Sequence, residues 1–143
     1  MESMINFLVY DRNIHRNDFI EMGMDYFNWI REECLEYFHL DFVDYFGPVD
    51  KYVMNSLPLF ESFHPPDSVI YIIIFENSIA GMGGIKHTTD EFSEIKRIFI
   101  KPEFRGKGFG NLLMLKLVET AREFGHRKLR QDTNSDMNLY DGI

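Results

Sequence analysis

The feature that most constrains the fold is a strand that runs into a glycine-rich turn and then into a helix. Residues 95–100, Ile-Lys-Arg-Ile-Phe-Ile, are rich in β-branched and aromatic side chains, and Pro102 removes the amide that would continue a ladder. Glycines occupy alternate positions within residues 106–110, and they permit a ligand to approach the main chain closely. From Asn111 onward, apolar residues recur every three to four positions, which predicts a helix.

This turn is a candidate anion site. A helix N-terminus presents unpaired N–H groups and roughly half a positive charge, and both favour a phosphate or pyrophosphate. The spacing of Gly106, Gly108 and Gly110 fits neither the Walker pattern nor the dinucleotide fingerprint. A connection that binds no ligand is the alternative, and the flanking Arg105 and Lys107 favour the anion site.

Composition predicts one domain over residues 1–143. Hydrophobic residues make up 45% of the chain and aromatic residues 15%, which is enough for a well-filled core. No apolar run approaches the ~20 residues that span a bilayer, and residues 1–4 lack the basic start of a signal peptide, so we expect a soluble cytoplasmic protein that binds no membrane. The lone cysteine, Cys34, lies in a helical apolar pattern and is expected to be a buried thiol.

Charge is unevenly distributed. The net charge of −8 argues against nucleic acid as a partner. Residues 96–130 hold ten Lys and Arg against three Glu, and the remainder holds five against twenty acids. We therefore expect a phosphate-rich ligand beside the turn and a cationic substrate elsewhere.

The N-terminal half is expected to hold a strand, two helices and a loop. The strand covers residues 5–10, and Asp18 and Glu21 stand at capping-box spacing ahead of the first helix. A shorter helix is predicted over residues 49–57. Prolines punctuate the following loop, which holds Pro58, Phe60, Phe63 and His64, and we expect it to line a substrate pocket.

The C-terminal half is predicted to be a sheet with one crossover helix. Residues 69–75 and 79–86 form a hairpin, and glycines within the second strand mark a bulge or a close backbone approach. Residues 95–100 pair antiparallel to it, and residues 128–133 form a last strand parallel to residues 95–100. The predicted fold is α/β with a mixed sheet, also described as α+β, in the order β-α-α-β-β-β-α-β.

Arg105-x-x-Gly108-x-Gly110, after a strand that ends in Lys101-Pro102, resembles the acetyl-CoA-binding motif of the GNAT N-acetyltransferases. From about Pro65 to Thr133 the order of elements is also similar to that family. The resemblance implies the acyl-CoA N-acyltransferase fold, acetyl-CoA as cosubstrate and no metal. It implies cofactor contacts from the following positions: Ile98, Phe99, Ile100, Arg105, Gly106, Lys107, Gly108, Phe109, Gly110, Asn111 and Asn134.

Transfer to an amine requires a proton acceptor. Glu94 opens the central strand at the position that matches the glutamate base of histone-acetylating members. A salt bridge from Glu94 to Lys96 or Arg97 is the alternative. The resemblance thus implies transfer of an acetyl group to a primary amine of a small molecule or protein by direct attack in a ternary complex. A non-catalytic CoA-binding or regulatory module and a Rossmann-like nucleotide domain are the other hypotheses.

The end of the chain departs from the family pattern. In the family, a Leu-Tyr pair, a Gly-Phe pair and two closing strands follow the position of Asn134, whereas this chain stops at Ile143. We therefore expect a C-terminally short domain in which Tyr140 lies on a short helix and is not the general acid. Residues 128–133 would then form an open edge that invites pairing with another chain, such as a homodimer partner, and acetyl transfer would be poor.

Overall fold

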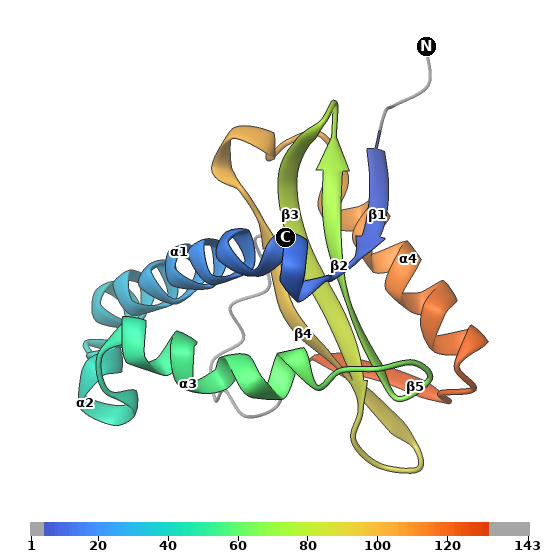
Figure 1. Cartoon of the computed structure of the whole chain (residues 1–143). Coiled ribbons are helices and arrows are strands. Elements are labelled where there is room, and N and C mark those ends of the chain that lie inside the picture. Colours follow the sequence, from blue (N-terminus) through green and yellow to red (C-terminus); the bar gives the residue numbers. More distant parts are fainter. Residues whose placement is uncertain (1–4, 132–143) are drawn as a thin grey trace.

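The protein is a five-stranded sheet with helices on both faces (Figure 1). The computed structural model describes residues 5–131 of the 143-residue chain. The strands lie in the order β1-β2-β3-β4-β5, with β1 to β4 antiparallel to their neighbours and β5 parallel to β4. The elements are β1 (Ile5–Val9), α1 (Arg12–Phe38), α2 (Phe42–Phe46), α3 (Val49–Glu61), β2 (Ser68–Phe75), β3 (Ser78–His87), β4 (Phe92–Ile100), a 3-10 turn (Pro102–Phe104), α4 (Phe109–Glu123) and β5 (Lys128–Gln131). The α+β class with a mixed sheet is confirmed.

Two apolar cores lie on opposite faces of this sheet. One core joins α1 and α3 to β2, β3 and β4, and includes Phe19, Phe60, Ile72 and Phe99. The other joins α4 to the same strands. Because strand side chains alternate between faces, neighbouring residues of β4 contribute to different cores. The helices therefore fix β4 from both sides.

The N-terminal helices differ from the prediction in three ways. α1 begins at Arg12, because the Asp11 carboxylate accepts a hydrogen bond from the Asn13 N–H at 2.8 Å, so the predicted capping box at positions 18 and 21 is wrong. α2 was not predicted, since its five residues are too few to show a helical period. α3 continues through Pro58, which was assigned to a loop, and ends at Glu61. A proline removes only its own amide, and the Ser62 N–H still donates to the Pro58 carbonyl at 3.1 Å.

The predicted hairpin and its close backbone contacts are confirmed. The turn residues Glu76 and Asn77 have φ of 49° and 66°, as in the primed turns that suit two-residue hairpins. Gly84 of β3 leaves no room for a side chain, because an added Cβ would lie 2.2 Å from the Val69 carbonyl oxygen. α4 begins at Phe109, two residues earlier than predicted, and β4 begins at Phe92, three residues earlier.

β4 contains a bulge that was not predicted. Met82 pairs with Phe99 and Gly84 pairs with Lys96, so β4 holds one residue more than β3 between these pairs. Arg97 has φ of 55° at this point, in the left-handed region. The bulge keeps Ile95 and Ile98, three residues apart, in the same core. That odd spacing breaks the two-residue period of a strand and is the sequence signal for the bulge.

The described part of β5 pairs with only the first four residues of β4, from Phe92 to Ile95. The predictions for residues 132–143, including Thr133 as a strand end, Asn134, Tyr140 and the open edge, lie outside the described residues. Within residues 5–131, no helix has the length and apolar character needed to cross a membrane.

Candidate active site

The glycine turn lies between β4 and α4, as predicted. Gly106 and Gly108 have φ of 80° and 83°, and an added Cβ at either position would meet no heavy atom within 4 Å. The glycines are therefore required for the backbone angle and not for space. Gly108 is the N-cap of α4, and the buried ring of Phe109 anchors the first turn of the helix against Phe75, with ring centroids 4.9 Å apart.

The N-terminus of α4 opens toward this turn. The Leu112 N–H donates to the Gly108 carbonyl at 3.1 Å, so the amides of Phe109, Gly110 and Asn111 precede the first intrahelical hydrogen bond. These amides and the helix dipole make the turn a site for an anion. The side chain of Lys107 is exposed beside it.

Arg105 ties the turn back to β4. Its Nε donates to the Ile100 carbonyl at 2.8 Å, and its guanidinium lies 5.5 Å from the centre of the Phe99 ring. The side chain is therefore held at the strand end, which leaves the backbone of the turn to face a ligand.

The last residues of β4 present main-chain groups away from β3. The Lys101 N–H donates to the Ala80 carbonyl at 2.8 Å, so the adjoining pair Ile100 and Gly81 is the non-hydrogen-bonded one. The amide and carbonyl of Ile100 then face the β5 side, and by the same alternation so do those of Ile98. Within residues 5–131, β5 pairs with β4 only as far as Ile95, so no described strand covers this stretch on the β5 side. An edge of this kind can bind an extended ligand.

Glu94 lies at the opposite, closed end of β4. Its side chain is 8% exposed, with one carboxylate oxygen 3.1 Å from Arg130 Nη2 and the other 3.5 Å from Lys96 Nζ. Both oxygens thus contact a cation. The alternative of an ion pair with Lys96 is present, and the partner from β5, Arg130, was missed because its place depends on the β4–β5 register.

Arg97 does not join Glu94. Its guanidinium lies 4.4 Å from the centre of the Phe60 ring and 4.7 Å from that of Phe27, between α1 and α3. Its Nη2 donates to the Ser56 hydroxyl at 2.6 Å. No sequence pattern pointed to this arrangement.

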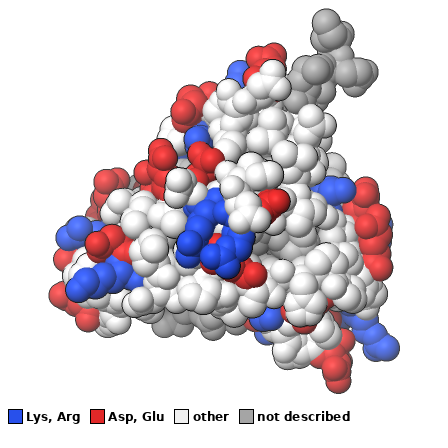
Figure 2. All heavy atoms as spheres, in the orientation of Figure 1, with Lys and Arg blue, Asp and Glu red and all other residues white. Residues whose placement is uncertain are grey.

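The basic segment is more dispersed than expected. Lys96 and Arg130 contact Glu94, Arg97 is buried, and Lys128 lies over the Phe92 ring. Strand residues alternate between faces, so a basic stretch of sequence does not become one basic surface. Figure 2 shows both signs of charge interspersed on the face that carries α1 and α3.

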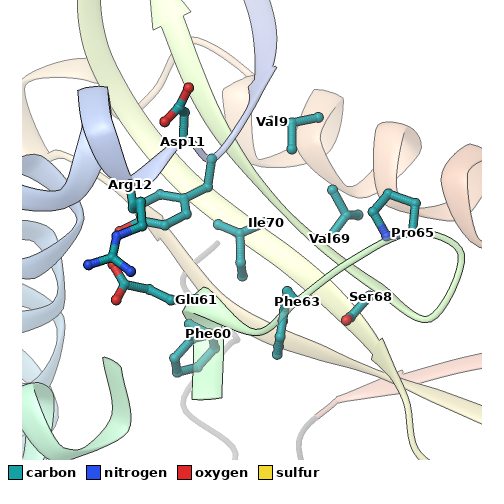
Figure 3. A pocket seen from close by; sticks show the side chains of 11 residues that line it. Val9, Asp11, Arg12, Phe60, Glu61, Phe63, Pro65, Ser68, Val69 and Ile70 are labelled. Carbon is teal, nitrogen blue, oxygen red and sulfur yellow. The ribbon is translucent and has the colours of Figure 1, made fainter. Parts of the chain in front are cut away.

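A pocket of about 400 Å³ opens between the end of β1, the end of α3 and the start of β2 (Figure 3). The α3 side of the pocket is lined by Phe60, Glu61 and Phe63. The two aromatic residues were predicted to line a pocket. His64, from the same predicted loop, is exposed and does not line it. The Tyr10 hydroxyl donates to the Glu61 carboxylate at 2.9 Å. Burial, followed by this hydrogen bond to a carboxylate, raises the pKa of Tyr10. The role of this pocket in binding substrate stays a prediction. The pocket lies beside β2, and β3 separates β2 from β4, which leads into the glycine turn, so the two strands are about 10 Å apart.

Other candidate groups can be placed briefly. Cys34 is buried in α1, and burial raises the pKa of its thiol, which agrees with a structural cysteine. Within residues 5–131, no three His, Cys, Asp or Glu side chains lie close enough together to hold a metal ion.

The sequence model of the acetyltransferase (GNAT) family matches residues 24–141. The chain therefore belongs to the GNAT family of acetyltransferases, and the family expected from the glycine motif is confirmed. An uncharacterised N-acetyltransferase of Escherichia coli (strain K12), YjgM, is 28% identical over 84 residues, which are 57% of this chain. The chain spans about half the length of this relative, since the match covers 50% of it.

Solved structures share the fold. A glucosamine-6-phosphate N-acetyltransferase from Arabidopsis thaliana has a TM-score of 0.58 at 17% identity, over 90% of this chain and 82% of that one. A predicted acetyltransferase from Clostridium acetobutylicum, solved with acetyl-CoA, has a TM-score of 0.58 at 15% identity, over 98% and 94% of the two chains. These likenesses establish the GNAT acyltransferase fold.

Proposed function

We propose that this protein binds acetyl-CoA and transfers its acetyl group to a primary amine by direct attack in a ternary complex. One observation carries the proposal: the anion site at the N-terminus of α4 adjoins the part of β4, from Ile98 to Ile100, that no strand within residues 5–131 covers on the β5 side. A phosphate-rich head and an extended, hydrogen-bonding arm need these two features side by side. Membership of the GNAT family supports the same assignment. We also propose a cytoplasmic location for the protein.

In this proposal the cofactor lies along β4 from the turn toward the bulge. The amides from Gly106 to Asn111, with Lys107, hold the pyrophosphate, and Arg105 positions the turn. The main-chain groups of Ile98 and Ile100, with Phe99 between them, align the pantetheine arm. The assigned contact from Asn134 remains part of the proposal, although that residue lies outside residues 5–131.

The chemical step is an acyl transfer. The lone pair of a neutral amine attacks the thioester carbonyl carbon, the C–S bond breaks, the departing thiolate takes a proton, and the amine loses one. A backbone N–H near Ile98, facing the open edge, would stabilise negative charge on the carbonyl oxygen. The products are an N-acetyl amine and CoA.

Glu94 is proposed to join β4 to β5 beneath this centre. Both of its oxygens contact cations, so accepting a proton from the amine would require one ion pair to open. The same observation favours a second function, a CoA-binding module without turnover. In the proposed transferase, water takes the amine proton.

Binding of three ligands tests the proposal. Calorimetry should give a 1:1 complex with acetyl-CoA and no complex with NAD or ATP at the same concentrations. Binding of NAD or ATP in place of acetyl-CoA would overturn the cofactor assignment and favour a nucleotide-binding domain.

Thiol release then separates the enzyme from the module. The panel would hold a polyamine and a lysine peptide, because the net charge of −8 favours cationic acceptors. It would also hold glucosamine 6-phosphate, the acceptor named for the Arabidopsis thaliana enzyme that shares the fold. Release above hydrolysis with one amine supports transfer. A protein that binds acetyl-CoA but releases no thiol with any primary amine is the module.

A further inference from the structure

We propose that Arg97 is a positioning residue, which holds the bulge in β4 and thereby fixes the edge from Ile98 to Ile100 that receives the pantetheine arm. This inference rests on the proposed function. It assigns the shape of the binding edge to a buried side chain on the opposite side of the strand from α4.

The bulge places Arg97 in an unfavourable backbone conformation. Its φ of 55° lies in the left-handed region, which is unfavourable for a residue that has a side chain. Such a conformation persists only where surrounding contacts hold it. The side chain of Arg97 supplies those contacts.

The guanidinium of Arg97 lies in a cage of three aromatic rings. Its centre is 4.4 Å from the Phe60 ring, 4.7 Å from the Phe27 ring and 5.8 Å from the Phe19 ring. A cation over aromatic faces is attracted to them, most strongly where water is excluded, and Arg97 is 6% exposed. The Ser56 hydroxyl accepts a hydrogen bond from the guanidinium at 2.6 Å.

The helices leave space for this group. Gly23 of α1 faces the guanidinium, and a Cβ added there would lie 3.1 Å from Arg97 Nη1 and 3.2 Å from Val53 Cγ1. α1 and α3 therefore both contact the side chain of Arg97, the bulge residue with positive φ. Their positions set where the extra residue of β4 lies.

The position of the bulge decides which way the following residues point. With the extra residue at Arg97, Ile98 and Ile100 pack on the α4 face and Phe99 on the α1–α3 face. Loss of the anchor would let the extra residue shift along β4, and the main-chain groups of Ile98 and Ile100 would lose their common direction. The turn would be affected less, because Phe109 anchors it independently in the α4 core.

The test compares acetyl-CoA with a fragment that keeps the adenosine, its 3′-phosphate and one 5′-phosphate but lacks the pantetheine arm. Acetyl-CoA would contact both the turn and β4, whereas adenosine 3′,5′-diphosphate, a fragment of CoA, has no pantetheine. Arg97→Met should weaken acetyl-CoA at least tenfold and adenosine 3′,5′-diphosphate less than twofold. Arg31→Met, which removes a half-exposed arginine of α1 that pairs with Asp41, should change neither. Equal weakening of both ligands by Arg97→Met, or of neither, would overturn the inference.

A second variant keeps the arginine. Gly23→Ala presses on the guanidinium and should weaken acetyl-CoA binding about threefold without affecting binding of the diphosphate.

Hydrogen exchange in the unliganded protein should quicken at Ile98 and Ile100 in Arg97→Met and stay unchanged at Leu113 and Leu117 of α4. If the wild type binds neither ligand, the proposed function fails, and the exchange result alone decides whether Arg97 holds the bulge.

Discussion

The two halves of β4 differ in strand pairing and in what their polar groups face. Residues 93–95 pair with β3 on one side and β5 on the other, and Glu94 there contacts two cations. Residues Ile98–Ile100 adjoin β3 on one side, follow a strained bulge and lead into a glycine turn. The polar side chains of the first half, Ser93 and Glu94, contact other residues of the protein, whereas the second half has main-chain groups that face away from β3.

This difference indicates a division of labour along one strand. The closed half should contribute mainly to the free energy of unfolding, and the open half mainly to ligand affinity. Substitutions on either side of Arg97 should therefore affect different measurements.

Glu94→Gln should give the largest effect, and on stability. Lys96 and Arg130 would face a neutral amide in a largely buried site, so the free energy of unfolding should fall by about 3 kcal/mol. Acetyl-CoA affinity should stay within threefold. Urea unfolding and calorimetry measure the two quantities.

Glu119→Gln is the matched control, because Glu119 is 64% exposed and lies 3.9 Å from Lys116. It should change stability by less than about 0.5 kcal/mol. Unchanged stability in Glu94→Gln together with a hundredfold loss of turnover would make Glu94 the catalytic base instead.

Gly108→Glu should give the largest effect on binding. It places a carboxylate at the proposed pyrophosphate site and strains a residue with φ of 83°, so acetyl-CoA should bind about 100-fold more weakly, or about 2.7 kcal/mol. Gly125→Glu imposes similar strain beyond the other end of α4, where φ is 80°, and should leave affinity unchanged. Weakening of less than tenfold by Gly108→Glu would move the site away from the turn.

Arg105→Met should have a smaller effect on binding. It removes the contact that ties the turn to the strand end and a positive charge beside the proposed pyrophosphate site, so we expect about tenfold weaker acetyl-CoA binding. Because the side chain is exposed, stability should stay within about 0.5 kcal/mol of the wild type. Arg122→Met, an exposed change in the last turn of α4, is the control. A stability loss larger than the affinity loss would place Arg105 with the closed half.

Asp67→Asn should give the smallest effect, and a pH-dependent one. Burial tends to raise the pKa of Asp67, but hydrogen bonds from Lys86 and Ser68 outweigh it and lower the pKa below its ordinary value of 3.8. A lowered folded-state pKa contributes stability above that ordinary value, and the contribution is lost as the pH falls through the folded-state pKa.

The expected loss at pH 7 is about 0.5 kcal/mol, because both side chains of the Lys86–Asp67 pair are about one-third exposed. The loss should shrink with added salt and vanish at low pH. Asp90→Asn in the exposed β3–β4 turn is the control and should leave stability at pH 7 unchanged. A loss that persists unchanged at pH 2 would assign the effect to something other than the charge of Asp67.

The open half of β4 was largely predictable from sequence, and the closed half was not. Glycine and proline act on their own backbone, so the glycine turn could be located from local sequence. The hairpin could be located from two apolar runs separated by a short polar turn. The partner of Glu94 is 36 residues away in Arg130, and only the β4–β5 register brings the two together. The bulge had a local signal in the odd spacing of Ile95 and Ile98, but the cage around Arg97 comes from helices that the sequence placed only roughly.

The distance along the chain between β4 and β5 has a consequence for the order of assembly. β2, β3 and β4 are joined by short turns and can pair early, whereas β5 can pair only after α4 has formed and crossed the sheet. The Glu94–Arg130 contact should therefore form after the rate-limiting step of folding. Removing it should speed unfolding while leaving the refolding rate nearly unchanged.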